Sequence, residues 1–193
     1  QQVLETTKKK AFGITTSNKS KVITETGALD TDFVDQVSKL VRSLSKGVAD
    51  AAKALGETDV ESVLAKFKVD LGKLSFKDMT GTQIEEALNA IFGKLGDDMA
   101  KAAVPVIAAF QKVGEGAFET LVRVARQYEV IDTTLKSVGM KFNDVGVASL
   151  AARERLVDLV GGLDNLTEQT SFFGENFLTD EERLKPVKDT VND

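Results

Sequence analysis

Cysteine, histidine and tryptophan are all absent from this chain of 193 residues. Without cysteine, neither disulfide bonds nor thiolate metal sites can stabilise the fold. Without histidine, the Ser-His-Asp and Cys-His catalytic arrangements and imidazole zinc sites are excluded. The chain is long enough to bury a core of its own, so its stability must come from apolar packing.

Long apolar runs and an excess of positive charge are missing as well. The longest apolar run, Ala102 to Phe110, has about nine residues, whereas a membrane-spanning helix needs about 20. No secretory signal pattern is visible near Gln1. The net charge of −5 favours solubility and argues against direct nucleic acid binding, which depends on lysine and arginine. We therefore expect no membrane span in this chain and no nucleic acid partner.

Phosphate-binding and catalytic motifs are also lacking. Gly114-Glu115-Gly116 has neither the third glycine nor the preceding strand of a dinucleotide-binding loop. We expect a protein without enzymatic activity, with no catalytic residues, no cofactor and no metal.

Two segments have the patterns of β-structure. Between Lys8 and Thr26, alternating apolar residues, a turn-forming Ser17–Ser20 segment and β-branched residues predict a hairpin. Its lysines either protect an exposed strand edge or bind an acidic partner. A further strand is predicted over residues 67–76, with a bulge near Gly72-Lys73 where the apolar parity changes.

The rest of the chain shows helical spacing. Asp30 begins a helix that ends at Gly56 and buries a stripe of apolar residues: Phe33, Val37, Leu40, Leu44, Val48, Ala51 and Leu55. Capping boxes at Thr80/Gln83 and Thr179/Glu182 begin two more helices. Pro105 kinks or ends the first of these.

Further helices are expected after Gly116, with Phe118, Leu121, Val122, Ala125 and Tyr128 buried, and over residues 145–160, 164–177 and 180–190. The predicted fold class is α+β, mainly α, in which amphipathic helices pack with a small antiparallel sheet made of the hairpin and one further strand. Residues 1–160 would form the body and residues 161–193 a C-terminal helical arm. Gly161-Gly162 is either a hinge between them or a helix stop within one domain.

Two blocks of sequence resemble the tail tape measure proteins of long-tailed bacteriophages and prophages. The first, residues 161–183, has a Gly-Gly-Leu-acidic-Asn-Leu helix, an aromatic cluster that ends in Asn-Phe, and an acidic-Glu-Glu-Arg start. The second, residues 84–126, contains Gly-Asp-Asp-Met-Ala, Val-Pro, Ala-Ala-Phe-Gln and Gly-Glu-Gly followed by Phe-Glu-Thr-Leu-Val-Arg. Both blocks occur in the order found in that family.

The resemblance implies a structural domain of a longer protein that sets tail length and acts through protein–protein contacts in tail assembly. Its expected partners are other phage tail proteins of the tube and tip, with self-association also open, and its expected location is the virion tail, and the host cytoplasm during assembly. Two alternatives are a cell-wall (peptidoglycan) hydrolase module of a tail protein and a generic helical adaptor domain.

Carboxylates are the residues on which the hydrolase alternative depends. Two of them can hydrolyse a glycosidic bond without histidine. Asp97-Asp98 and Glu85-Glu86 lie on one predicted helix, but their spacing forms no metal-binding loop, and a solvated helix face is the favoured interpretation. Sugar stacking is disfavoured because the chain has no tryptophan and one tyrosine.

Three phenylalanines are the candidate interaction residues: Phe172, Phe173 and Phe177. Phe173 and Phe177 share a helix face, whereas Phe172 points elsewhere, so the three rings cannot all cover one narrow seam. At least one is expected to be exposed or to reach a neighbouring chain. Core packing is the favoured interpretation for Phe173.

Overall fold

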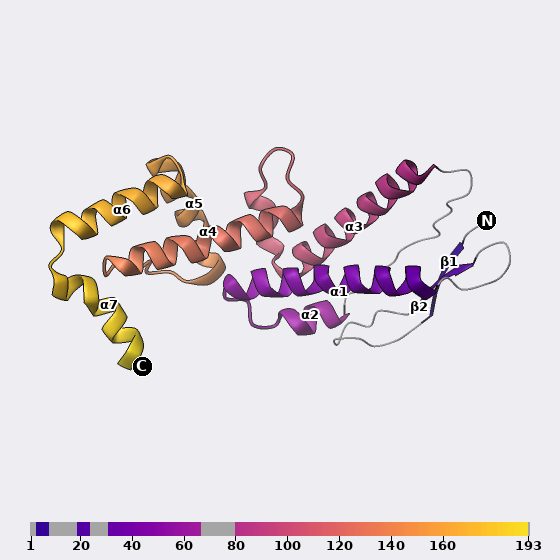
Figure 1. Cartoon of the computed structure of the whole chain (residues 1–193), viewed down its shortest axis with the longest axis horizontal. Helices are drawn as coiled ribbons and strands as arrows, with labels where there is room; N and C mark the ends of the chain where they lie inside the picture. The colour runs from indigo at the N-terminus through magenta and orange to yellow at the C-terminus, as the bar shows by residue number, and fades with distance from the viewer. Residues whose placement is uncertain (1–2, 8–18, 24–30, 67–79, 193) are drawn as a thin grey trace. The chain divides into compact units, whose positions relative to one another are not determined.

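The computed structural model describes residues 3–7, 19–23, 31–66 and 80–192 of the chain. In order, the elements are β1 (Val3–Thr7), β2 (Lys19–Ile23), α1 (Thr31–Ala54), α2 (Val60–Lys66), α3 (Gly81–Ala103), the 3-10 helix η1 (Pro105–Phe110), α4 (Ala117–Ser137), the 3-10 helix η2 (Gly146–Ser149), α5 (Leu150–Val160), α6 (Leu163–Phe177) and α7 (Asp180–Asn192) (Figure 1).

The predicted α+β fold class, with helices packed against a sheet, is wrong. Helices make up 82% of the interpretable part of the structure. No strand contributes a residue to the described core. Every buried apolar residue of the described core lies in a helix or directly beside one. The physical reason is that amphipathic helices bury their apolar stripes against each other, so that no sheet face is needed to cover them.

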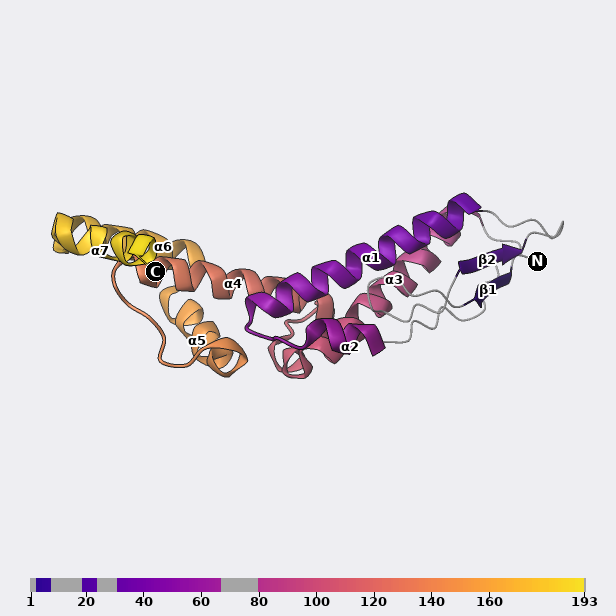
Figure 2. The ribbon, with the colours of Figure 1, turned by 90° about the horizontal axis from the view of Figure 1, so that it is seen from below.

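The N-terminal strands form only a two-stranded ribbon. β1 and β2 pair antiparallel, with Val3 opposite Ile23 and Thr7 opposite Lys19 (Figure 2). The turn predicted at Ser17–Ser20 is misplaced, because β2 already begins at Lys19. A ribbon of this kind is marginally stable by itself and makes no layer of a domain. The further strand and bulge predicted over residues 67–76 lie outside the described residues.

Most helix boundaries agree with the prediction. α1 ends at Ala54, just before Gly56, and α3 ends at Ala103, just before Pro105. The capping box that begins α3 is present: the Thr80 amide donates to Gln83 Oε1 at 2.8 Å, and the Gln83 amide donates to Thr80 Oγ1 at 3.4 Å.

The buried face of α1 differs from the predicted stripe. Val41 is 6% exposed, whereas Leu40 is 49% exposed, and Ala52 rather than Ala51 is fully buried. Both positions fit a helical stripe through Val37 and Val48, so spacing alone does not select between them. On α4, Leu121 is buried as expected, but Val122 is 44% exposed.

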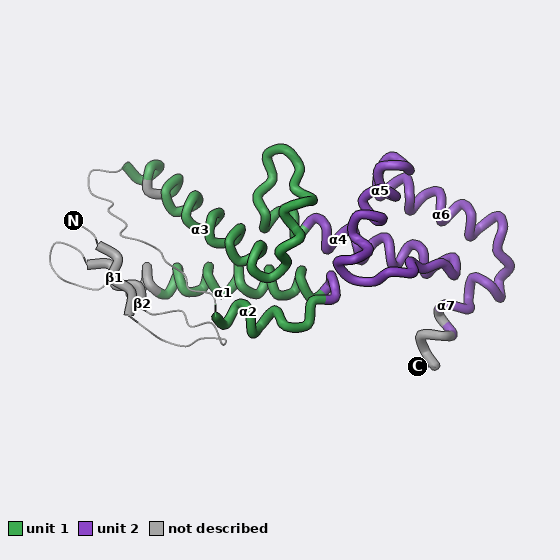
Figure 3. The backbone as a smooth tube through the Cα atoms, turned by 180° about the vertical axis from the view of Figure 1, so that it is seen from behind, with its two compact units in different colours: residues 1–53, 57–122 green, residues 54–56, 123–193 purple. Residues whose placement is uncertain are grey.

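The chain divides into two compact units (Figure 3). The first comprises residues 1–53 and 57–122, and the second comprises residues 54–56 and 123–193. The predicted division into a body of residues 1–160 and a C-terminal arm of residues 161–193 stays a prediction. Gly161 and Gly162 themselves end α5: the Gly162 amide donates to the Val157 carbonyl at 2.8 Å.

In the first unit, the start of α4 is held by a side chain from α3. Asp97 Oδ1 accepts the backbone amide of Phe118 at 2.9 Å, which satisfies one of the free N–H groups at this helix end. Gly116 lies against the same carboxylate, and a Cβ placed there would come within 2.6 Å of Asp97 Oδ1. The prediction that Asp97 lies on a solvated face is therefore wrong.

The ring of Phe118 is enclosed by two helical glycines of the same unit. A Cβ added at Gly47 of α1 or at Gly96 of α3 would lie 3.4 Å from its side-chain atoms. That distance is an ordinary van der Waals contact, so the ring packs close to both helices without glycine being sterically required at either position.

In the second unit, a buried arginine joins α4, α5 and the segment between them. Arg153 is 3% exposed. Its guanidinium lies 3.7 Å from the centroid of the Tyr128 ring and 4.5 Å from that of Phe142. Its Nη2 donates to Asp132 Oδ1 at 2.6 Å, and its Nε donates to Ser149 Oγ at 2.8 Å. A desolvated arginine between two rings, with its N–H groups paired, combines cation–π attraction with charged hydrogen bonds.

The remaining polar atoms around Arg153 are also paired. Ser149 donates its hydroxyl to the Gly146 carbonyl at 2.8 Å, and the Gly146 amide donates to the Tyr128 hydroxyl at 3.0 Å. The network thus fixes η2 against α4 as well as α5.

Removal of the Asp97 carboxylate tests whether its bond to the Phe118 amide stabilises the start of α4. We expect Asp97→Ala to lower the free energy of unfolding by about 1 kcal/mol, the usual cost of losing a capping side chain. Gly116→Ala should also destabilise, because its methyl group displaces the Asp97 carboxylate. Gly93→Ala is the control, since nothing lies within 4 Å of its added Cβ and it should stabilise α3. Urea unfolding measures all three; unchanged stability in Asp97→Ala would contradict the cap.

Removal of the buried arginine tests whether the Arg153 network stabilises the second unit. Arg153→Ala should destabilise the chain by about 3 kcal/mol, because it breaks a partly buried ion pair, leaving Asp132 with Lys136 as its remaining partner, and uncovers two aromatic faces. Arg155 on the same helix is exposed, so Arg155→Ala should change stability by less than about 0.5 kcal/mol. Equal unfolding midpoints for the two variants would show that Arg153 has no such role.

Candidate interaction surface

One face of α6 packs into the second unit. Leu166 is 5% exposed and lies in an apolar cluster with Ile131 of α4 and Val157 of α5. Gly174, one turn from the end of α6, is buried, and a Cβ added there would lie 3.5 Å from Val138 Cγ1. This face therefore serves packing within the unit.

The three candidate phenylalanines lie outside that packed face. Phe172 is 60% exposed, Phe173 44% and Phe177 67%. Phe177 stacks on Phe173 with ring centroids 5.5 Å apart, and it meets Phe172 edge-on at 6.3 Å. We call these three residues the aromatic cluster. Their rings contact each other and remain largely open to solvent.

Exposure of Phe173 departs from the favoured sequence interpretation. Leu163, Leu166, Phe173 and Phe177 follow one heptad-like spacing, which predicts a single buried stripe. Gly174, however, already contacts Val138, the residue that follows α4. Because α4 ends next to Gly174, the C-terminal part of the apolar stripe on α6 has no helix to pack against and is exposed to solvent.

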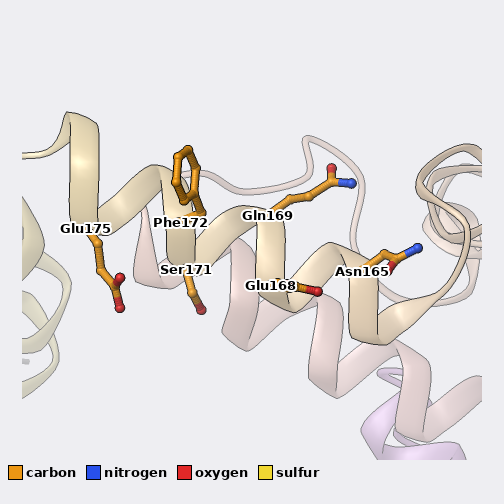
Figure 4. A pocket seen from close by; sticks show the side chains of 6 residues that line it. All are labelled: Asn165, Glu168, Gln169, Ser171, Phe172 and Glu175. Carbon is orange, nitrogen blue, oxygen red and sulfur yellow. The ribbon is translucent and has the colours of Figure 1, made fainter.

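The surface of α6 around the aromatic cluster is acidic. Its charged residues are Asp164, Glu168 and Glu175, and it contains no lysine or arginine. A shallow depression along the helix is lined by Asn165, Glu168, Gln169, Ser171, Phe172 and Glu175, with the ring of Phe172 projecting from the helix (Figure 4). In the part of the chain that the structure describes, neither Glu168 nor Glu175 has an ion-pair partner.

The predicted capping box at the start of α7 is present. The Thr179 amide donates to Glu182 Oε2 at 2.9 Å, and the Glu182 amide donates to Thr179 Oγ1 at 3.3 Å. The bonds from the Thr179 amide and hydroxyl hold the pKa of the Glu182 carboxyl below its ordinary value. Asp180 pairs with Arg183. These carboxylates lie at the positive end of the helix dipole, which stabilises negative charge at the start of α7.

No site for a metal emerges from the described residues, which contain no group of three or more acidic side chains able to hold an ion. No described helix is long and apolar enough to cross a membrane. Comparison with protein-family models, with curated proteins and with solved structures finds no match to this chain.

Sequence reasoning missed two side chains that organise the units, Asp97 and Arg153. A signal existed for the second, because Arg153 occupies the apolar stripe of α5 between Leu150 and Val157. For Asp97, the nearest signal was the glycine directly before α4.

The exposure of the aromatic cluster predicts how its variants behave. Phe172→Ala and Phe177→Ala should each change the free energy of unfolding by less than about 1 kcal/mol, since surface substitutions have small effects. Leu166→Ala should cost about 3 kcal/mol, because it opens a cavity in the packed face of α6. Thermal and urea unfolding compare the three. A loss in Phe172→Ala as large as that in Leu166→Ala would mean that the ring is part of the core.

Proposed function

We propose that this chain is a structural domain of a phage tail tape measure protein and acts in tail assembly and length determination through protein–protein contacts. The observation that carries the proposal is the resemblance of two sequence blocks, residues 84–126 and 161–183, in the family's order. The partners would be tail tube and tail tip proteins, with self-association as a further possibility, and the domain would reside in the virion tail after assembly in the host cytoplasm.

The arrangement of the two blocks is compatible with a scaffolding role. The first block covers most of α3, η1 and the start of α4, including the Asp97 cap. The second covers α6, the aromatic cluster and the capped start of α7. Within the second block, Leu166 is buried in the unit, whereas the aromatic cluster is exposed. Exposed aromatic side chains are frequent anchors of protein interfaces.

Capture of tail components from phage-producing cells tests the proposal. The immobilised chain should retain tail tube or tip proteins. Truncation after Gly162 is a poor control, because it would remove Leu166 from the apolar cluster of the second unit. The double variant Phe172→Ala/Phe177→Ala keeps that packing and should retain at least about tenfold less of the same proteins, the size expected when aromatic anchors are lost. Leu159→Ala, on a residue that is 77% exposed, serves as the matched control. Failure to retain any tail protein would contradict the proposal.

A further inference from the structure

The aromatic cluster combines two properties that together select a kind of partner. Its three rings offer apolar contact area, since each remains between 44% and 67% exposed. Large exposed aromatic side chains bury much area at little cost in conformational freedom, so such clusters are typical anchor points for a partner.

Every charged side chain of α6 is acidic, and so are the first three residues of α7, which are followed by Arg183 and Lys185. Asp164, Glu168 and Glu175 of α6 are exposed, and the first turn of α7 adds Asp180, Glu181 and Glu182. Of these six carboxylates, Asp180 is the one with an ion pair among the described residues, through Arg183. A partner that covers the rings would bring its own charges next to the remaining five.

Charge complementarity excludes some occupants and favours one. A second copy of this chain that paired through α6 would place like charges opposite each other, which disfavours association. Lysines or arginines on the partner would instead meet carboxylates that lack an ion pair among the described residues, and an arginine beside Phe172 could lie over its ring while it bonds to Glu168 or Glu175.

We propose that the aromatic cluster and its acidic surroundings bind a basic amphipathic helix of another protein. The apolar face of that helix covers Phe172, Phe173 and Phe177, and its lysine or arginine face meets the carboxylates of α6 and of the first turn of α7. This is recognition of an amphipathic helix by an apolar surface, with electrostatics setting which helices are accepted. The inference goes beyond the proposed tail function and does not require it.

A synthetic peptide of the same length as α6 tests the inference on the full chain. The probe carries leucines at helical spacing on one face and arginines on the other, with a fluorophore at one end. Fluorescence anisotropy should show saturable binding that weakens as salt is added, because the charges on the rim are screened. A second peptide, with glutamate at every arginine position, should bind at least about tenfold more weakly, since its charges oppose those of the surface. A third, with the residues of the first in scrambled order, should also bind weakly because it lacks the apolar face.

Variants of the protein assign the binding to this surface. Phe172→Ala/Phe177→Ala should weaken binding of the arginine peptide about tenfold or more, the effect of removing two anchors. Glu168→Gln/Glu175→Gln should weaken it several-fold and reduce its dependence on salt. Leu159→Ala should bind as the unchanged chain does. Circular dichroism and thermal unfolding confirm that each variant is folded.

Three results of the peptide binding experiments would overturn the inference: equal binding of the arginine and glutamate peptides, unchanged binding by the phenylalanine variant, or no binding of the arginine peptide at all. Analytical sedimentation of the chain without peptide tests the alternative that a second copy of this chain covers the aromatic cluster. Dimers that dissociate in Phe172→Ala/Phe177→Ala would mean that a second copy covers the aromatic cluster and that the proposal of a basic helix is wrong. Because the peptides are synthetic, a negative result here leaves the capture of tail proteins as a separate test.

Discussion

The guanidinium group of Arg153 is the centre on which the second unit depends. It contacts the Tyr128 and Phe142 rings, pairs with Asp132, and shares a hydrogen bond with Ser149, so that α4, α5 and the segment between them meet at one side chain. A buried charge of this kind is costly unless all its partners are in place. The network therefore favours one arrangement of these elements over less well packed alternatives. The buried face of α6 packs against α4 and α5, two of the elements that this network joins.

The first unit relies on a smaller version of the same principle. The Asp97 carboxylate accepts a backbone amide at the start of α4, and Gly116 leaves room for it. In a chain without cysteine, no covalent link can hold helices in register. Polar groups that are satisfied between elements supply specificity that apolar packing alone does not provide.

Local features of this chain could be predicted from its sequence, and long-range ones could not. The capping boxes at Thr80 and Thr179 are formed by residues three positions apart, and the ends of α1 and α3 are set by Gly56 and Pro105. Burial of Val41 rather than Leu40 depends on where other helices lie. So does the exposure of Phe173, which follows from the end of α4 near Gly174. The expected sheet was wrong for a related reason: alternation indicates a strand locally, but only the packing of whole elements determines whether a sheet joins the core.

The direction in which α6 leaves α5 is set by two residues without side chains. Gly161 and Gly162 have φ angles of 79° and 122°, which other amino acids adopt only with strain. With the chain in these conformations, Leu166 of α6 packs in the same apolar cluster as Val157 of α5, and the three phenylalanines remain exposed. The orientation of the aromatic, acidic surface of α6 thus depends on the backbone conformation at Gly161 and Gly162. Substitution of these glycines would change the direction of α6 even if every phenylalanine and carboxylate were kept.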